Sequence, residues 1–357
     1  MPANIGENFI IEDGIARISE DDARRLQRHR MEPGDIVYSR RGDVERRALI
    51  REDNAGWLCG TGCLRVHFGS HGENDPAFVS YQLGTEWTRE WIVRHAVGAT
   101  MLNLNTGILS AVPLERPPLH EQRAIAEVLG ALDDKIAANS KLASTAEDLA
   151  RTLALAVPVT VPLGEIVEHI KTTVNPEGLA DDRVAHFSLP AFDAGIEPEI
   201  VGPQEIKSNK FLVREPSVLV SKLNPRFPRV WNIPTISPLT SLASTEFVTL
   251  RPRFSSTTVL WALTSQPAFG AALEAMVAGT SGSHQRVKPA EMLSTLVPDP
   301  RTMSDVLVGQ IGGLGLRAIS SRDENRTLAA TRDILLPQLM SGKLRVKDAE
   351  RIVSEVA

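Results

Sequence analysis

One long stretch of the chain places its apolar residues in alternating steps of four and three positions. Within residues 119–155 this spacing begins at Ile125 and ends at Leu153. It is typical of a coiled-coil seam, in which one side of a helix faces a partner helix. The seam positions are Ile125, Leu129, Leu132, Ile136, Asn139, Ala143, Ala146, Ala150 and Leu153. A second long helix is expected from about Ser304 to Leu339.

The segments before the two long helices consist of short apolar runs separated by turn residues. In residues 1–118, the run GDIVYSRRGD predicts a strand bounded by Gly34 and Gly42, and a stretch with helical spacing follows it. In residues 156–300, the run FLVREPSVLVSKLNP parallels that strand. A helical stretch, a glycine-containing loop and a proline-containing segment then follow in the same order. The sequence therefore predicts two similar mixed domains.

The two helices also align with each other at a fixed offset. Asn139 falls on Asn325, and the further seam positions of the second helix are Leu328 and Leu335. We expect an α+β fold with two similar mixed α/β domains separated by two long antiparallel coiled-coil helices related by a pseudo-twofold axis. Asn139 and Asn325 should lie close to each other near that axis and fix the register. The predicted boundaries are 1–118, 119–155, 156–300, 301–345 and a tail at 346–357.

The composition excludes several classes of protein. No apolar run is long enough to span a membrane, and the first residues do not resemble a signal peptide. Cys59 and Cys63 give no disulfide framework, which favours a cytoplasmic location. The net charge of −5 argues mildly against nucleic acid as a partner. Basic residues nevertheless concentrate in residues 17–51 and 207–230, so the charge is unevenly distributed.

Four segments resemble, in the same order, the specificity subunit of type I restriction–modification systems: GDIVYSRRGDVERRALI, WLCGTGCLRV, VPLERPPLHEQRAIAEVLGALDDKI and LLPQLMSGKLRV. The resemblance implies two target-recognition domains, each reading half of a bipartite site on double-stranded DNA. It implies that the long helices dock two modification (methyltransferase) subunits. It further implies that this chain has no catalytic centre or cofactor, that the modification subunits methylate adenine with S-adenosylmethionine, and that a separate restriction (motor) subunit uses ATP and Mg.

Candidate DNA contacts lie on loops of both domains. Arginine suits guanine, whereas asparagine and glutamine suit adenine. The loops GATMLNLNTG and GTSGSHQRVK supply the candidate base readers, which are Thr100, Asn103, Asn105, His284, Gln285, Arg286 and Lys288. The candidate phosphate contacts are Arg40, Arg41, Arg46, Arg47, Lys222, Asn224, Arg226 and Arg229. The alternative for each residue is an ordinary solvated surface.

Two rival functions remain open, whereas catalysis and metal binding are not expected. Cys59, Cys63, His67 and His71 are evenly spaced, but glycines interrupt the helix that would gather them on one face. No methyltransferase or phosphate-loop motif is complete. One rival is a free-standing DNA-binding regulator, against which the acidic long helices argue. The other is an assembly scaffold with decayed recognition domains, against which the two basic segments argue.

The first domain has a shorter opening than the second. VPLGEIVEHI begins roughly fifty residues before FLVREPSVLV, whereas only about thirty residues precede GDIVYSRRGD. At the helix offset, Ile352 and Val353 fall on Ile166 and Val167 of VPLGEIVEHI. The tail is therefore expected to supply the missing opening and to bury Ile352 and Val353 against the first domain. A gene start placed too late or a truncated gene are the alternatives.

Overall fold

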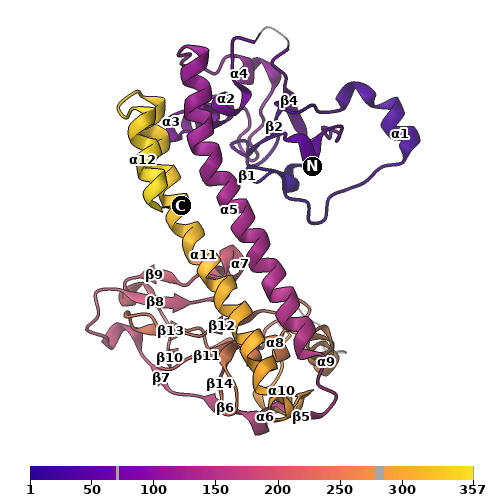
Figure 1. The fold of residues 1–357 in the computed structure, drawn as a ribbon, viewed down its shortest axis with the longest axis vertical. Coiled ribbons are helices and arrows are strands. Elements are labelled where there is room, and N and C mark those ends of the chain that lie inside the picture. Colours follow the sequence, from indigo (N-terminus) through magenta and orange to yellow (C-terminus); the bar gives the residue numbers. More distant parts are fainter. Residues whose placement is uncertain (70–71, 278–284, 357) are drawn as a thin grey trace. The chain divides into compact units, whose positions relative to one another are not determined.

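The computed structural model describes residues 1–69, 72–277 and 285–356 of the chain. The chain divides into a first unit, residues 1–139 with 324–357, and a second unit, residues 140–323. Two long helices, α5 (Leu119–Ala154) and α11 (Asp305–Met340), each contribute one part to each unit (Figure 1). Over the described ranges, no helix is long and apolar enough to cross a membrane.

A four-stranded sheet forms the centre of the first unit. Its strands are β1 (Glu7–Asn8), β2 (Ile36–Ser39), β3 (Arg47–Leu49) and β4 (Cys63–Val66). They lie in the order β1-β3-β2-β4, with β2 antiparallel to both β3 and β4. β1 runs parallel to β3. The predicted strand of GDIVYSRRGD is therefore β2, the inner strand that orients the loop after it.

The first unit also contains short helices, the first of which lies between β1 and β2, while the other three follow β4. They are α1 (Glu20–Arg25), α2 (Pro76–Leu83), α3 (Glu86–His95) and α4 (Thr106–Ser110), with 3-10 turns at Pro2–Asn4, Gln27–His29 and Glu52–Asn54. α2 begins with Pro76 in its first turn, and the Asp75 carboxylate accepts a hydrogen bond from the Phe78 N–H at 2.9 Å. These are the residues that start a helix well, because they satisfy or remove the free N–H groups of its first turn.

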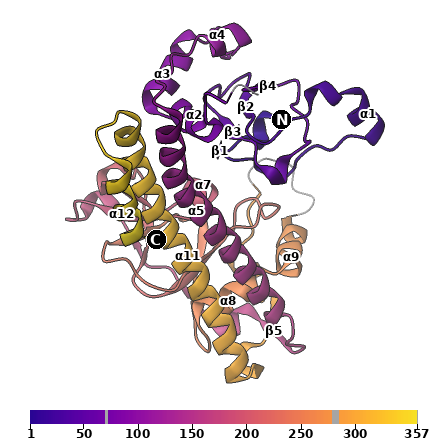
Figure 2. The same ribbon diagram turned by 45° about the horizontal axis from the view of Figure 1, so that its top comes forward.

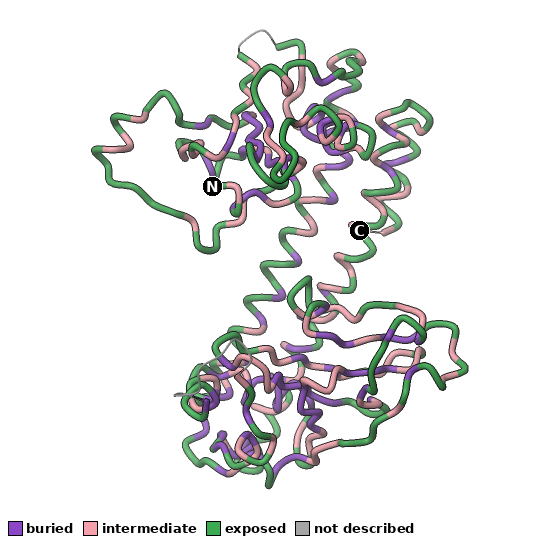
Figure 3. Tube along the Cα trace, turned by 180° about the vertical axis from the view of Figure 1, so that it is seen from behind, coloured by how far each residue is buried: buried purple, intermediate pink, exposed green. Residues whose placement is uncertain are grey.

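The core of the first unit joins the sheet, α2, and the adjoining parts of the long helices. Leu129 and Leu132 of α5 and Leu328 and Leu335 of α11 are buried in one cluster with Phe78. Low residue numbers of α5 meet high residue numbers of α11, so the two segments run antiparallel within this unit. In Figure 3, buried positions recur along one side of each helix segment.

The second unit contains more strands than the first. A five-stranded sheet has the order β7-β10-β13-β8-β9, a four-stranded sheet has the order β12-β11-β14-β6, and β15 pairs with β5. The strands are β5 (Thr160–Pro162), β6 (Val167–Ile170), β7 (Thr173–Val174), β8 (Val184–Phe187), β9 (Glu199–Val201), β10 (Lys210–Val213), β11 (Ser217–Ser221), β12 (Val230–Ile233), β13 (Ser241–Ala243), β14 (Phe247–Pro252) and β15 (Leu296–Pro298). The helices are α6 (Leu163–Ile166), α7 (Leu189–Gly195), α8 (Thr257–Thr264), α9 (Pro267–Val277) and α10 (Pro289–Ser294), with 3-10 turns at Pro176–Gly178, Pro203–Glu205 and Pro300–Thr302.

The two units share one succession of elements. In each, a central strand (β2 or β11) pairs antiparallel with the next strand (β3 or β12) and with the strand that precedes the helices (β4 or β14). Three helices and a long helix then follow in both. The predicted α+β class, with two similar mixed domains and two long helices, is confirmed.

The tail does not repeat the opening of the second domain. β6 pairs with β14 in the second unit, whereas β4 has β2 as its one strand neighbour among the described residues. The tail instead forms helix α12 (Val346–Val356), which lies beside α11 in Figures 1 and 2. Ile352 and Val353 are half-buried against the core cluster of the first unit. The expected contact therefore exists, but a helix makes it.

The asparagine pair lies inside the first unit. Asn139 is buried, and Asn325 Nδ2 donates to the backbone oxygen of Ile136 at 3.1 Å, three residues before Asn139. Both amides therefore lie at the same level of the helix pair, with Asn325 turned toward α5. In the second unit the side chains of the seam are small, since Ala143 and Ala146 pack against Ala318.

Candidate nucleic-acid interface

Two loops of the second unit are joined by backbone hydrogen bonds. The Val287 N–H donates to the Lys222 oxygen and the Asn224 N–H donates to the Gln285 oxygen, both at 2.9 Å. Leu223 and Arg286 form an isolated antiparallel bridge between these bonds. The turn after β11 and the segment before α10 therefore make one continuous surface, although they are about sixty residues apart in the sequence.

The first unit contains the same arrangement. The Leu104 N–H donates to the Arg40 oxygen and the Gly42 N–H donates to the Leu102 oxygen, both at 2.9 Å, and Arg41 bridges Asn103. Asn103 thus occupies the position that Arg286 has in the second unit. The predicted correspondence between the two loops holds for the backbone of residues 102–104 and 285–287, whereas residues 279–284 lie outside the described chain.

The arginines of the second unit are held by carboxylates. Arg286 donates through Nε and Nη2 to the two oxygens of Glu246, each at 3.0 Å, and remains about half exposed. This pairing raises the pKa of Arg286. Arg229 makes a two-point contact with Asp193 at 2.7 and 2.8 Å. These side chains are therefore oriented before any ligand arrives.

Four further candidates of the second unit border the same surface. Arg226 pairs with Glu274 at 3.1 Å, and Lys288 pairs with Glu291 at 3.4 Å. Asn224 has a positive φ of 49°, which its short polar side chain tolerates in a tight turn. Lys222 is half-buried at the start of the turn. His284 lies outside the described residues.

The candidates of the first unit are mostly exposed. Arg40, Arg41 and Thr100 are open to solvent, and Arg46 pairs with Asp43 at 2.7 Å. The bend that presents Thr100 contains Gly98, whose φ is +131°. A Cβ at this position would lie 2.2 Å from the Met101 oxygen.

The two asparagines of this loop have local partners. Asn103 Nδ2 donates to the Met101 oxygen at 3.2 Å. Asn105 caps α4 by accepting from the Ile108 N–H at 2.9 Å, so its carbonyl oxygen is already engaged. The exposed edge of Asn103 is therefore the better placed of the two for a ligand.

Arg47 requires a correction. Its side chain is only 3% exposed, and Nε donates to the Ser80 oxygen at 2.5 Å. The prediction that Arg47 neutralises a DNA phosphate is therefore wrong for this conformation, because the guanidinium faces the interior of the first unit.

The residues considered for metal binding do not gather. Over the described residues, no group of three or more His, Cys, Asp or Glu side chains could hold a metal ion, and His71 lies outside that part of the chain. His67 Nδ1 lies 2.7 Å from the Asp35 carboxylate. Cys59 and Cys63 are free thiols, and burial raises the pKa of Cys59 to about 11.

Sequence reasoning missed two residues of this surface. Phe227 is 65% exposed on the turn beside Arg226 and is flanked by prolines at positions 225 and 228. An aromatic residue between prolines in a basic segment was the available signal. Glu246 is the other, since it holds Arg286 from forty positions away and nothing in its local sequence marks it.

Comparison with known proteins gives one family and one fold. Residues 13–147 match the family model described as the type I restriction modification DNA specificity domain. The fold is similar to that of the type I restriction-modification system S subunit from M. genitalium, with a TM-score of 0.53 and 17% identity over 87% of this chain and 83% of that one. No curated protein matches the sequence.

Two further solved chains align over similar lengths with lower scores. The HsdS subunit from Thermoanaerobacter tengcongensis gives a TM-score of 0.30 and 17% identity over 88% of this chain and 82% of that one. A chain from a structure of the type I R-M system gives a TM-score of 0.37 and 16% identity over 96% of this chain and 90% of that one.

Proposed function

Through residues 13–147 the chain belongs to the type I restriction–modification DNA specificity family, and from this premise we propose that it reads a bipartite DNA sequence for a modification and restriction complex. Each unit would read one half of the site. The proposal assigns this chain recognition and assembly, and it assigns the chemistry to partner subunits.

The observation that carries the proposal is the pair of equivalent loop surfaces. In both units the turn after the central strand is fixed to the loop before a short helix by the same two backbone hydrogen bonds. Side chains at the bridge therefore project from a rigid frame, which base recognition requires because each hydrogen bond must meet a base edge within a few tenths of an ångström.

Arg286 is the best-placed base reader. A guanidinium that already spans the two oxygens of Glu246 has the geometry needed for the O6 and N7 acceptors of guanine. The pair is partly exposed, so solvent screening keeps its net contribution in water small. Exchange of the carboxylate for a guanine edge would therefore cost little.

The long helices are the proposed docking surface for two modification subunits. They carry large apolar side chains that neither unit buries, among them Leu149, Leu316 and Ile334, which are 46%, 59% and 61% exposed. A free-standing regulator has no use for such positions, which favours assembly. In the assembled complex, S-adenosylmethionine would belong to the modification subunits, and ATP with Mg to a restriction subunit.

The DNA proposal is tested with the chain co-expressed with its modification subunits, on the site found by methylome sequencing. Lys222→Ala with Arg226→Ala should weaken binding to all sequences and make the slope of log K against log salt shallower by about 0.9 for each phosphate that the variant no longer neutralises. Lys171→Ala with Arg253→Ala is the matched control, since both are exposed and lie outside the loops. Unchanged affinity across the salt series would contradict a DNA contact at this turn.

Base reading has a different signature. Arg286→Ala should reduce discrimination at one base pair of one half-site by about 1–3 kcal/mol and leave nonspecific affinity nearly unchanged. An equal loss on cognate and random DNA would assign Arg286 to the phosphate backbone instead.

The docking proposal is tested by co-purification. Leu316→Glu should abolish stoichiometric recovery of the modification subunits without changing the melting temperature of the isolated chain. Phe254→Glu is the control, because Phe254 is similarly exposed but lies outside the long helices. Normal recovery with the Leu316 variant would place the docking surface elsewhere.

A further inference from the structure

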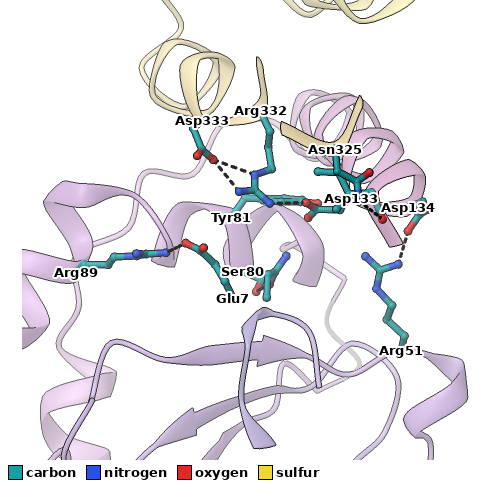
Figure 4. Close-up of polar contacts among 12 residues, drawn as sticks. Glu7, Arg51, Ser80, Tyr81, Arg89, Asp133, Asp134, Asn325, Arg332 and Asp333 are labelled. Carbon is teal, nitrogen blue, oxygen red and sulfur yellow. Dashed lines mark hydrogen bonds and ion pairs between the residues drawn. The ribbon is translucent and has the colours of Figure 1, made fainter. Parts of the chain in front are cut away.

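The first unit has an open cavity of about 560 Å³ between its sheet and the long helices. We call it the Arg47 cavity. Its lining includes Asn8 of β1, Arg47 of β3, Gly84, Thr85 and Arg89 at the start of α3, and Arg332 of α11. Figure 4 shows several of the polar side chains around it. None of these residues belongs to the paired loops of the proposed DNA interface.

Arg47 places a buried positive charge in this lining without a counter-ion. No carboxylate lies within ion-pair distance of its guanidinium among the described residues, and its Nε contact is a backbone oxygen. The nearest carboxylates are held by other arginines, Glu7 by Arg89 and Asp133 by Arg332. Burial lowers the pKa of Arg47 for this reason. A buried cation without a partner is costly, so the site is incomplete as it stands.

A second group in the lining lacks an acceptor. Asn8 is 5% exposed, its Oδ1 accepts from the Ser80 hydroxyl, and its Nδ2 has no hydrogen-bond partner in the described chain. Asn8 also has a positive φ of 69°, so the backbone holds this amide in an uncommon conformation. Arg89 Nε is likewise buried without an acceptor. Among the described residues of the lining, the buried side-chain atoms without a hydrogen-bond partner are therefore donors.

The start of α3 adds to this donor character. Gly84, Thr85 and Glu86 line the cavity, and α3 begins at Glu86 after its N-cap Thr85. The free N–H groups of a helix's first turn favour a negative ligand. Gly84 is needed here, because a Cβ at this position would lie 1.8 Å from Arg47 Nη2.

The second unit shows that the fold does not require this arrangement. Tyr38 pairs with Arg47 as Val220 pairs with Val230, so Val230 occupies the equivalent strand position. The residue that ends α2 is Gly84, and the residue that ends α8 is Ser265. The second unit therefore folds with the apolar Val230 at the strand position that Arg47 occupies in the first unit. The buried arginine is a feature of the first unit and not of the shared fold.

We propose that the Arg47 cavity binds a small oxyanion, the phosphate or carboxylate group of a compact ligand, between Arg47, Asn8 Nδ2 and the start of α3. An oxyanion carries the acceptor atoms and the negative charge that these donors lack. Glu45 and Glu86 also line the cavity and have no ion pair among the described residues. Their charge disfavours a polyanion such as DNA and limits the ligand to a small group.

The test titrates the full chain with inorganic phosphate and, separately, with acetate, at fixed pH and ionic strength balanced with chloride. Isothermal titration calorimetry should show one saturable site for at least one anion, and the melting temperature should rise over the same concentration range. The anion with the lower dissociation constant identifies the ligand group. Absence of saturable binding for both anions overturns the proposal.

Two variants and a control make the result specific. Asn8→Asp puts a carboxylate oxygen where Nδ2 stands, so it should raise the melting temperature without phosphate and abolish the response to it. Arg47→Met should raise the dissociation constant by about tenfold or more, as loss of a charge-assisted contact does. Arg253→Gln, an exposed arginine of the other unit that lies outside the paired loops, should leave binding intact. Saturable binding that survives Asn8→Asp would refute this site, even if Arg47→Met does not fold.

Discussion

Removal of the Arg332 charge should destabilise the first unit by more than removal of its partner does. The Asp133 carboxylate accepts from the Tyr81 hydroxyl at 2.7 Å and from Arg332 Nη1 at 2.8 Å (Figure 4). The side chains of Arg332 and Asp133 are only 17% and 14% exposed. This contact joins α2 to both long helices, so it holds the helical part of the first unit together.

The structure gives different costs for the two single changes. Arg332→Met leaves the Asp133 carboxylate buried with Tyr81 alone, and losing one member of a buried pair costs about 3–5 kcal/mol. Asp133→Asn keeps an acceptor for Tyr81, and Arg332 keeps its exposed partner Asp333 at 2.8 Å. That change should cost about 1–2 kcal/mol. The double variant buries no unpaired charge and should be more stable than Arg332→Met alone.

Urea denaturation followed by circular dichroism measures the three free energies of unfolding. The matched control is Arg322→Met, which breaks the Arg322–Glu147 pair at 2.6 Å in the second unit. Its effect should add to that of Asp133→Asn without coupling. If Arg332→Met and Asp133→Asn are themselves additive within about 0.5 kcal/mol, the two side chains do not form a coupled buried pair and the reasoning fails.

Leu129→Ala should cost about 2–5 kcal/mol in urea denaturation, since Leu129 is fully buried in the seam. Asn139→Leu should stabilise by about 1–3 kcal/mol, because Nδ2 of this buried residue has no acceptor among the described residues; a loss of stability would show that its oxygen accepts an essential hydrogen bond. Burial, then Lys210, lowers the pKa of His186, so the unfolded chain takes up a proton more readily. The melting temperature should therefore hold above about pH 6.5 and fall toward pH 5, and His186→Asn should flatten this profile.

The long helices could be predicted from the sequence because the burial of one apolar side determines both their periodicity and their extent. A seam in steps of four and three buries one side of a helix, and prolines limit where it can run. The helix expected over residues 119–155 is α5, Leu119–Ala154. The order of segments likewise sufficed to relate the two mixed domains, since matching turns and helices follow matching strands.

The direction of single side chains could not be predicted in the same way. Several arginines crowd the turn between β2 and β3, and whether one turns inward depends on its register opposite Tyr38 and on room left by the distant Gly84. The partner of Arg286 depends on β14 lying beside β11, which is a tertiary contact. The tail was matched on two residues, whereas the apolar spacing of Ala349, Ile352, Val353 and Val356 suits a helix.

The hydrogen bonds that join the paired loops in each unit involve backbone atoms alone. Natural selection can therefore change the side chains at the bridge without breaking these hydrogen bonds. One unit has Asn103 at the bridge and the other has Arg286, yet both keep the same donor and acceptor pattern. A new target sequence then requires few substitutions, because replacing a side chain at the bridge changes the free energy of unfolding very little. A library varied only at Asn103 and Arg286 should therefore yield mostly folded proteins with altered targets.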